Sequence, residues 1–233
     1  MKGFYNHYVK VHMRHLFPKT VSYTRYVELM ASANLPLALF VKACCMGSST
    51  GISFMDSTPL RVCKNKRISR NKVFDEVGAL GKFTIGFFFG FKLHLVVNDK
   101  GELLNFMLTA ANVDDLQPLK DPAFIKAFTG KLYADKGYVS AELTHALFCD
   151  GIHLVTQIQN NMKNCLIELK DKILLRKRSI IETINDELKN MCQIEDLRHR
   201  SLANFLSNLL AGLAAYSFFP KKPALKYDSV HTN

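Results

Sequence analysis

The stretch Gly51–Leu60, GISFMDSTPL, decides the fold that the sequence predicts. Its apolar residues predict a short buried strand over Ile52–Met55, and this strand delivers one carboxylate, that of Asp56. Pro59 has no amide hydrogen to donate to a sheet, so we expect the strand to end near it. An acid at the end of a buried strand can present a metal ligand at the edge of the sheet, but most such aspartates are turn or cap residues. The other segments of the chain have to decide whether Asp56 is a metal ligand or a turn or cap residue.

The segments that follow predict an α/β fold, a mixed sheet flanked by helices. Residues 85–97 and Leu103–Thr109 predict an antiparallel hairpin, and Gly101 in the turn between them can adopt a positive φ. Lys131–Ala134 and Ile152–Gln157 predict single strands next to helices, which favours parallel pairing. The helices are expected at about residues 116–128, 141–149 and 166–218, the last with a break near His199–Ser201.

Asp135 follows its predicted strand as Asp56 follows the first one. If the two strands are neighbours, these acids can meet although 79 positions (135 minus 56) separate them in the chain. The last helical region adds Glu182, with Arg178 four residues before it and Lys189 seven residues after it. At about 100° per residue, the three side chains share one face of a helix. The same spacing also fits a solvated face with i,i+4 ion pairs.

Two strand-end aspartates and a helical glutamate make an oxygen-only site that suits Mg²⁺, with Mn²⁺ as a substitute. Carboxylates that lie together raise one another's pKa, and two divalent cations would relieve this repulsion. Two such ions can activate a water or a DNA 3′-hydroxyl and stabilise the leaving oxygen of an in-line displacement. Asn112–Asp115 offers further acids, for which capping of the next helix is the favoured role.

The basic residues favour a polyanionic partner. The net charge of +11 over 233 residues points first to nucleic acid and second to an anionic membrane. The most uneven run, residues 61–72, has no acid and is either a solvated loop or a surface that neutralises phosphates. Its cations are Arg61, Lys64, Lys66, Arg67, Arg70 and Lys72.

Composition divides the chain into three expected parts. They are residues 1–50, a partial helical region; residues 51–219, the α/β domain with the three acids; and residues 220–233, a basic disordered tail. In the first part, a helix is expected to begin near Ser22, and Pro36 kinks or divides it. Gly47–Gly51 is a small polar linker and marks the boundary.

The cysteines and the N-terminus indicate a cytoplasmic protein. None of the six cysteines belongs to a C-x-x-C pair, which is typical of reduced cysteines in the cytosol. The first residues are polar, aromatic and basic and do not resemble a signal peptide. Leu202–Phe219 contains Asn and Ser residues, so it predicts a packed helix and not a membrane span. We therefore expect no membrane partner.

Three motifs stand out: DST at Asp56, YADKGY around Asp135, and R-x3-E-x6-K at Arg178, Glu182 and Lys189. They resemble the motifs of the DDE transposases of bacterial insertion sequences, and the sequence closely resembles the insertion-sequence nine-eighty-two family. The resemblance covers about residues 1–222 and includes the stretches GFFFGFKLHLVVNDKGEL and HRSLANFLSNLLAGLAAY.

This resemblance implies a ribonuclease-H-like core that uses divalent metal to cut and join transposon-end DNA. It implies Asp56, Asp135 and Glu182 as the metal ligands. It implies Lys189 as a DNA contact and Arg178 as a support for the helix. The implied partners are the terminal inverted repeats, target DNA and further copies of the chain, since DDE enzymes commonly act as oligomers on paired ends.

Two departures from the family pattern bear on activity. The signature has a Tyr three residues before Arg178, where this chain has Leu175. Relatives usually carry a longer helical N-terminal region, which helps to bind transposon ends. The sequence therefore leaves two functions open, an active transposase and a truncated DNA-binding remnant without activity. A cellular ribonuclease-H-like nuclease also fits the fold, but it does not fit the extended motif match.

Overall fold

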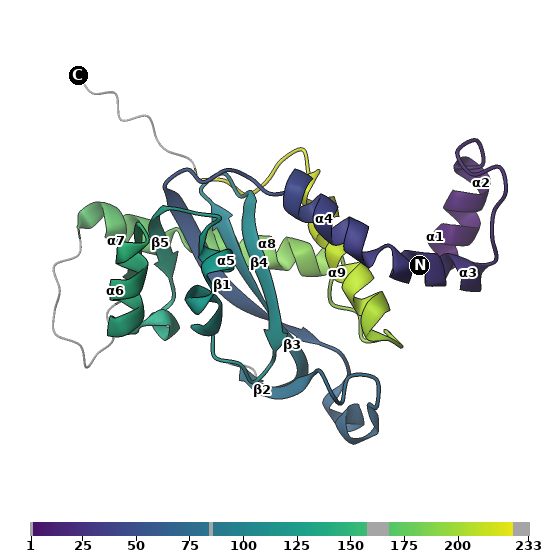
Figure 1. Cartoon of the computed structure of the whole chain (residues 1–233), viewed down its shortest axis with the longest axis horizontal. Coiled ribbons are helices and arrows are strands. Elements are labelled where there is room, and N and C mark those ends of the chain that lie inside the picture. Colours follow the sequence, from purple (N-terminus) through teal and green to yellow (C-terminus); the bar gives the residue numbers. More distant parts are fainter. Residues whose placement is uncertain (1, 84–85, 158–167, 226–233) are drawn as a thin grey trace.

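The computed structural model of the chain describes residues 2–83, 86–157 and 168–225. These residues form a six-stranded sheet with helices packed on both of its faces (Figure 1). The strands are β1 (Ile52–Arg61), β2 (Ala79–Phe83), β3 (Gly86–Asn98), β4 (Leu103–Ala110), β5 (Gly130–Ala134) and β6 (Ile152–Thr156). The longer helices are α3 (Tyr23–Ser32), α4 (Asn34–Cys44), α6 (Ala141–Cys149), α7 (Leu169–Arg176), α8 (Ser179–Asn190) and α9 (Leu202–Ser217). The short ones are α1 (Lys2–Phe4), η1 (Tyr5–Val9), α2 (Lys10–His12), η2 (Asn65–Arg70), η3 (Gln117–Lys120), α5 (Pro122–Ile125) and η4 (Lys136–Tyr138).

The sheet is mixed, as the sequence predicts. Its central order is β3, β1, β5, β6, and both β2 and β4 pair with β3. β1 is antiparallel to β3 and parallel to β5, and β5 is parallel to β6. β3 and β4 form the expected hairpin, with Gly101 at a φ of +76° in the turn. The predicted α/β class, a hairpin joined to parallel strands and flanked by helices, is therefore confirmed.

β1 does not end near Pro59, as we expected, but continues to Arg61. β5 pairs with β1 only over Ile52–Phe54, whereas β3 pairs with it as far as Arg61. The amide of Arg61 donates to Oε1 of Glu195 and not to β3. Because alternate residues of a strand point their amides to the same side, Pro59 lacks its hydrogen where β1 has no partner strand. Asp56 therefore lies within β1, just beyond the point at which β5 stops pairing with it.

Two further expectations need correction. The sequence does not predict β2, which is five residues long and has Gly81 at its centre, where a strand signal is weak. The helix expected over residues 116–128 is instead the two short turns η3 and α5. Each of these turns has a proline in its first positions, and a proline cannot donate to a preceding turn.

The helical region expected over residues 166–218 consists of three helices. α7 and α8 meet at a bend, and Arg178 is the N-cap residue of α8. The arginine is therefore at the start of the helix that carries Glu182, and not inside one long helix. The break between α8 and α9 spans residues 191–201, which is wider than expected. Cys165 and the start of the predicted helix lie outside the described residues.

Apolar side chains alternate between the two faces of the sheet. Phe54 of β1 and Tyr133 of β5 belong to the core formed with α4, α8 and α9. Met55 and Ala134, the next residue in each strand, belong to the core formed with α5 and α6. Figure 1 shows α4 and α9 on one side of the sheet and α6 on the other. Residues 56 and 135 follow the alternation and lie on the face that α8 covers.

The N-terminal helices pack on this core through α4. Val41 of α4 is fully buried, and the Asn34 side chain donates to the carbonyl of Ala203 in α9. Ser22 caps α3, as predicted, and α3 and α4 meet at an angle of 53° close to Pro36. Within the described residues, no single helix has the length and apolarity needed to cross a membrane. The bent pair α3 and α4 meets the criterion together, on length and composition alone.

The first residues of the predicted tail pack on the hairpin turn. The amide of Leu225 donates to the carbonyl of Asp99 at 2.8 Å, and the Tyr216 hydroxyl donates to the carbonyl of Gly101 at 2.7 Å. Lys222 Nζ donates to the carbonyl of Ser217 at 2.7 Å. The expectation of a disordered tail is therefore wrong for residues 220–225, and residues 226–233 lie outside the described part of the chain.

Candidate active site

The parallel register of β1 and β5 brings Asp56 and Asp135 together. Phe54 lies opposite Tyr133 in this register, and each acid is two residues beyond its member of that pair. Since both strands run in the same direction and side chains alternate, the two carboxylates lie at the same level and on the same face. One pair of neighbouring strands thus brings together two acids that are 79 positions apart in the sequence (135 minus 56).

Glu182 reaches this position on α8. One face of α8 is apolar and is buried against the sheet and α9; its buried residues are Ile180, Ile181, Ile184, Asn185 and Leu188. This spacing is that of an amphipathic helix, and it leaves the opposite face in solvent. Glu182 lies in the first turn with its side chain 57% exposed, so the packing of α8 on β1 sets the height of the glutamate above the strand acids.

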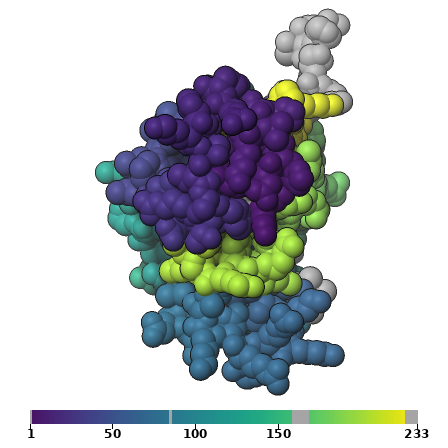
Figure 2. Space-filling model, turned by 90° about the vertical axis from the view of Figure 1, so that its right-hand side faces the viewer, coloured from purple at the N-terminus to yellow at the C-terminus, as the bar shows by residue number. Residues whose placement is uncertain are grey.

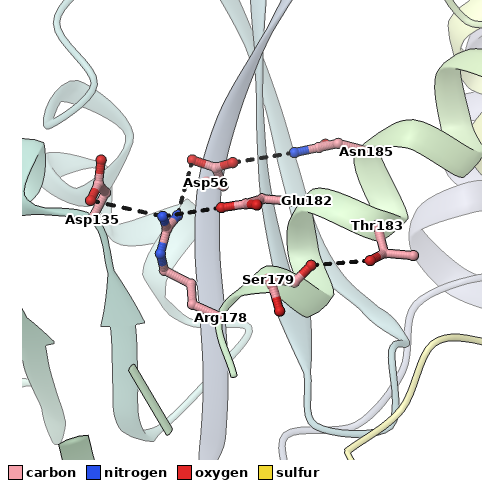
Figure 3. Close-up of polar contacts among 7 residues, drawn as sticks. All are labelled: Asp56, Asp135, Arg178, Ser179, Glu182, Thr183 and Asn185. Carbon is pink, nitrogen blue, oxygen red and sulfur yellow. Dashed lines mark hydrogen bonds and ion pairs between the residues drawn. The ribbon is translucent and has the colours of Figure 1, made fainter. Parts of the chain in front are cut away.

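Arg178 lies between the three acids, as Figure 3 shows. Its guanidinium is 3.6 Å from Asp56 Oδ1, 3.8 Å from Asp135 Oδ1 and 3.3 Å from Glu182 Oε1. The side chain of Arg178 is 15% exposed, while those of the two aspartates are 22% and 43% exposed. One cation thus faces three carboxylates that come from two strands and a helix.

Asp56 is the most deeply placed of the three acids. Its pKa is raised to about 6, chiefly by burial and to a smaller extent by the charges of Glu182 and Asp135, although Arg178 and the amide of Ser57 oppose these effects. Asn185 Nδ2 donates to Asp56 Oδ2 at 3.4 Å. The sequence analysis did not identify Asn185, although its position three residues after Glu182 on the same helix was a usable signal.

The donor set fits a hard divalent cation. Three carboxylates that converge on a guanidinium form a cation-binding environment, and carboxylate oxygens are the ligands that Mg²⁺ and Mn²⁺ prefer. In the described part of the chain, however, no three Asp, Glu, His or Cys side chains are close enough together to hold one ion as they stand. Arg178 is the group that would have to move for the three acids to share a metal.

The predicted DNA-contacting residues lie beyond this centre. Lys189 is two turns further along α8 and lies 3.6 Å from Glu195. It lines a cavity of about 1010 Å³ together with four cations of the basic run, Lys64, Arg67, Arg70 and Lys72. The two remaining members of the run lie elsewhere: Arg61 ends β1, and Lys66 is exposed in η2.

Leu175 and the Asn112–Asp115 segment, both noted in the sequence, have clear structural roles. Leu175, which replaces the Tyr of the family signature, is 6% exposed and packs in the core beneath α8. Asp114 accepts a hydrogen bond from the amide of Leu116, and Asp115 pairs with Lys92 at 3.0 Å. The Asn112–Asp115 segment therefore stabilises a turn and an ion pair with Lys92.

Comparisons with known proteins identify a family and a similar fold. The family model described as "Transposase DDE domain" matches residues 46–202. The fold is similar to that of the piggyBac transposase in a cryo-EM structure of its synaptic complex with hairpin DNA, with a TM-score of 0.53 and 10% sequence identity. That similarity covers 83% of this chain but 52% of the piggyBac chain, so this chain spans about half of its length. No curated protein gives a significant match.

The family match covers more than half of the sequence. It includes β1, β5 and α8, the three elements that carry Asp56, Asp135 and Glu182. This chain belongs to the family of transposase DDE domains.

Proposed function

We propose that this chain is a transposase that cuts DNA at the ends of an insertion sequence and transfers the cut strand to target DNA. The convergence of Asp56, Asp135 and Glu182 on one partly buried guanidinium carries this proposal, because no structural need places three acids from distant segments together. We further propose membership of the insertion-sequence nine-eighty-two family, with terminal inverted repeats as the DNA that is cut and the bacterial cytosol as the compartment.

In this proposal, the three carboxylates hold divalent cations, Mg²⁺ or Mn²⁺. Bound as a pair, such ions supply an activated oxygen nucleophile and stabilise the leaving oxygen of an in-line displacement. The β1–β5 register fixes the spacing of Asp56 and Asp135, and the packing of α8 fixes the approach of Glu182. Asn185 orients Asp56 through its amide. Arg178 then turns from the carboxylates toward a DNA phosphate.

The basic residues are proposed to hold the DNA backbone without reading bases. Lys189 and Arg178 would contact phosphates nearest to the cleaved bond, and the run after β1 would contact phosphates further away. The members of that run are Arg61, Lys64, Lys66, Arg67, Arg70 and Lys72. Pairing of two DNA ends would require more than one copy of the chain, so we propose a homo-oligomer on DNA.

The test is a cleavage and strand-joining assay on DNA that carries the element's terminal repeats, with Mg²⁺ or Mn²⁺. We expect the wild type to nick at the repeat boundary and Glu182→Gln to lose about 10³-fold in rate, because a ligand of the metal centre stabilises the transition state by several kcal/mol. Glu142→Gln is the matched control, since Glu142 is an exposed acid in the first turn of α6.

The outcomes separate the alternatives. Cleavage by Glu182→Gln at the wild-type rate would contradict the assignment of this acid. Binding without cleavage by the wild type would identify a DNA-binding remnant. Metal-dependent cleavage that ignores the repeat boundary would favour a cellular nuclease of the same fold over a transposase.

Arg178→Gln is expected to destabilise the protein in the absence of divalent ions by about 2 kcal/mol, because three carboxylates would lose the cation that they share. Added Mg²⁺ should recover more stability in this variant than in the wild type, where the metal has to displace the guanidinium. Chemical denaturation with and without Mg²⁺ measures both effects. Arg176→Gln removes an exposed arginine of α7 and serves as the control. Equal Mg²⁺ responses in wild type and Arg178→Gln would show that arginine and metal do not compete.

A further inference from the structure

Cations line the cavity beside Lys189 on two segments of the chain. One wall is the segment after β1, with Lys64, Arg67, Arg70 and Lys72. The other wall is the end of α8 and the break that follows it, including Lys189 and Arg198, which no motif singled out. Only Glu195 and Asp196 oppose these six cations among the described residues that line the cavity. The two acids pair with Lys189 and Arg198, so the excess of positive charge in the cavity comes from the four cations of the first wall.

A second cavity, of about 700 Å³, continues the first one toward α3. The two share Gln193, Asp196, Arg198 and His199, so the break between α8 and α9 forms the floor of one long groove. The second cavity adds Lys2 and Arg200 as cations. In Figure 2, the yellow-green band of the chain lies between the blue residues around η2 and the purple N-terminal helices.

Arg198 is held in an orientation that suits phosphate binding. Its Nε and Nη2 donate to the two oxygens of Asp196 at 3.0 and 3.2 Å, and its side chain is 88% exposed. The remaining donors of the guanidinium face solvent, so a phosphate can be bound without breaking this pair. The exposed pair contributes little to folding stability, and Arg198 is therefore free to serve a partner.

The lining of the first cavity favours duplex DNA over a single strand. Surfaces that bind single strands combine cations with aromatic side chains on which bases stack. Within the described part of the chain, no Phe, Tyr or Trp lines this cavity. This first cavity can therefore hold a sugar–phosphate backbone but offers unpaired bases no Phe, Tyr or Trp to stack on, whereas Tyr23 lines the second cavity.

The groove is also within reach of the three acids. Lys189 follows Glu182 by seven residues on the same helix, which corresponds to about 10 Å along its axis. This is the length of about three base pairs at about 3.4 Å each. A duplex whose cleaved phosphate lies at the acids therefore needs about three further base pairs to reach the level of Lys189.

We propose that this groove holds the backbone of the duplex that flanks the cleaved phosphate, with Arg67 and Arg198 as cations on opposite walls. The inference rests on the proposed function for the position of the cleaved phosphate. It adds the segment between α8 and α9 as a binding element and duplex DNA as its ligand.

The test measures binding of a short mixed-sequence duplex by fluorescence anisotropy over a range of salt concentrations, with EDTA to prevent cleavage. Each phosphate contact that is lost reduces the slope of log K against log salt by about 0.9. We expect this reduction for Arg67→Ala and for Arg198→Ala, and about twice as much for the double variant. Arg198→Lys should keep the wild-type slope, and Lys126→Ala, which removes an exposed cation on the opposite face of the sheet, is the control.

An unchanged slope for Arg198→Ala would overturn the proposal, as would single-stranded DNA of the same length bound as tightly as the duplex. The result is separable from the cleavage assay. Loss of slope in a protein that never cleaves would support the groove and contradict the transposase activity. Cleavage at the repeat boundary with unchanged slopes would contradict the groove and leave the activity standing.

Discussion

Asp56→Asn is expected to abolish metal-dependent DNA cleavage and, in the same protein, to raise the free energy of unfolding at neutral pH. The loss of activity follows from the removal of the most buried of the three carboxylates, and about 10³-fold is expected. The gain in stability follows from the cost of keeping that carboxylate ionised in the folded protein. Asparagine has nearly the same shape as aspartate and carries no charge, so this substitution removes the charge and leaves the packing almost unchanged.

The sign of the stability effect follows from proton binding. The pKa of Asp56 is raised from 3.8 to about 6 by burial, so the folded state binds its proton more tightly than the unfolded state. The stabilisation from Asp56 is therefore present below pH 3.8 and is lost as the pH rises through about 6. A difference of about two pKa units corresponds to about 3 kcal/mol. The amide that replaces the carboxylate does not titrate, so Asp56→Asn should be more stable by up to about 3 kcal/mol at about pH 7.5.

Chemical denaturation of both proteins at about pH 3.5 and about pH 7.5 measures this effect. The difference between them should be close to zero at the lower pH, and at the higher pH it should shrink when Mg²⁺ stabilises the wild type alone. Glu142→Gln, which replaces an exposed acid on α6, is the control. If Asp56→Asn were less stable than the wild type at the higher pH without metal, the burial cost inferred for this carboxylate would be wrong.

Gly130→Ala is expected to destabilise the protein by about 3 kcal/mol and to disturb the arrangement of the acids in the candidate active site. Gly130 has a φ of +86°, and a Cβ built on it would lie 2.5 Å from the carbonyl oxygen and 2.8 Å from the Cα of Gly51. An alanine costs about 1 kcal/mol in the left-handed conformation, and the backbone contact adds about 2 kcal/mol. The collision occurs where β5 begins to pair with β1, so it should also displace Asp135 from Asp56.

Gly151→Ala is the matched control. Gly151 has a φ of +79°, but a Cβ there would meet no atom within 4 Å, so only the conformational cost of about 1 kcal/mol remains. Urea denaturation of the two variants isolates the backbone contact as the difference between them. Equal destabilisation by the two substitutions would show that the protein accommodates a Cβ at position 130 beside Gly51 at no cost in stability.

Much of the sheet could be predicted from the sequence. The dense Phe, Ile and Val pattern before Gly101 and the turn that this glycine allows predict the hairpin, and it is present. The length of β1 could not be predicted, because Pro59 is a strand breaker only where its amide would face a partner. At Pro59, that side of β1 has no partner strand. The sequence alone does not indicate on which side a strand will be unpaired.

The acids of the site could be identified from their motifs, whereas the position of Arg178 could not. On a continuous helix, Arg178 would face solvent beside Glu182, but the bend before α8 directs it toward Asp56 and Asp135. The second wall of the groove was missed for a related reason. Residues 191–201 have no periodic pattern, and only the fold shows that Arg198 and Arg67 line the same cavity.

The β1–β5 pairing has a consequence for synthesis of the chain. Asp56 and Glu182 are 126 positions apart (182 minus 56), and a ribosome adds these residues in about 6 to 25 s. During this time the nascent chain has its first acid and later gains β5 with Asp135, but the site stays incomplete because α8 has not yet been made. Contacts between such distant segments form slowly even in a complete chain. Under the proposed function, a chain that stops before α8 lacks the third acid and would therefore not cut DNA.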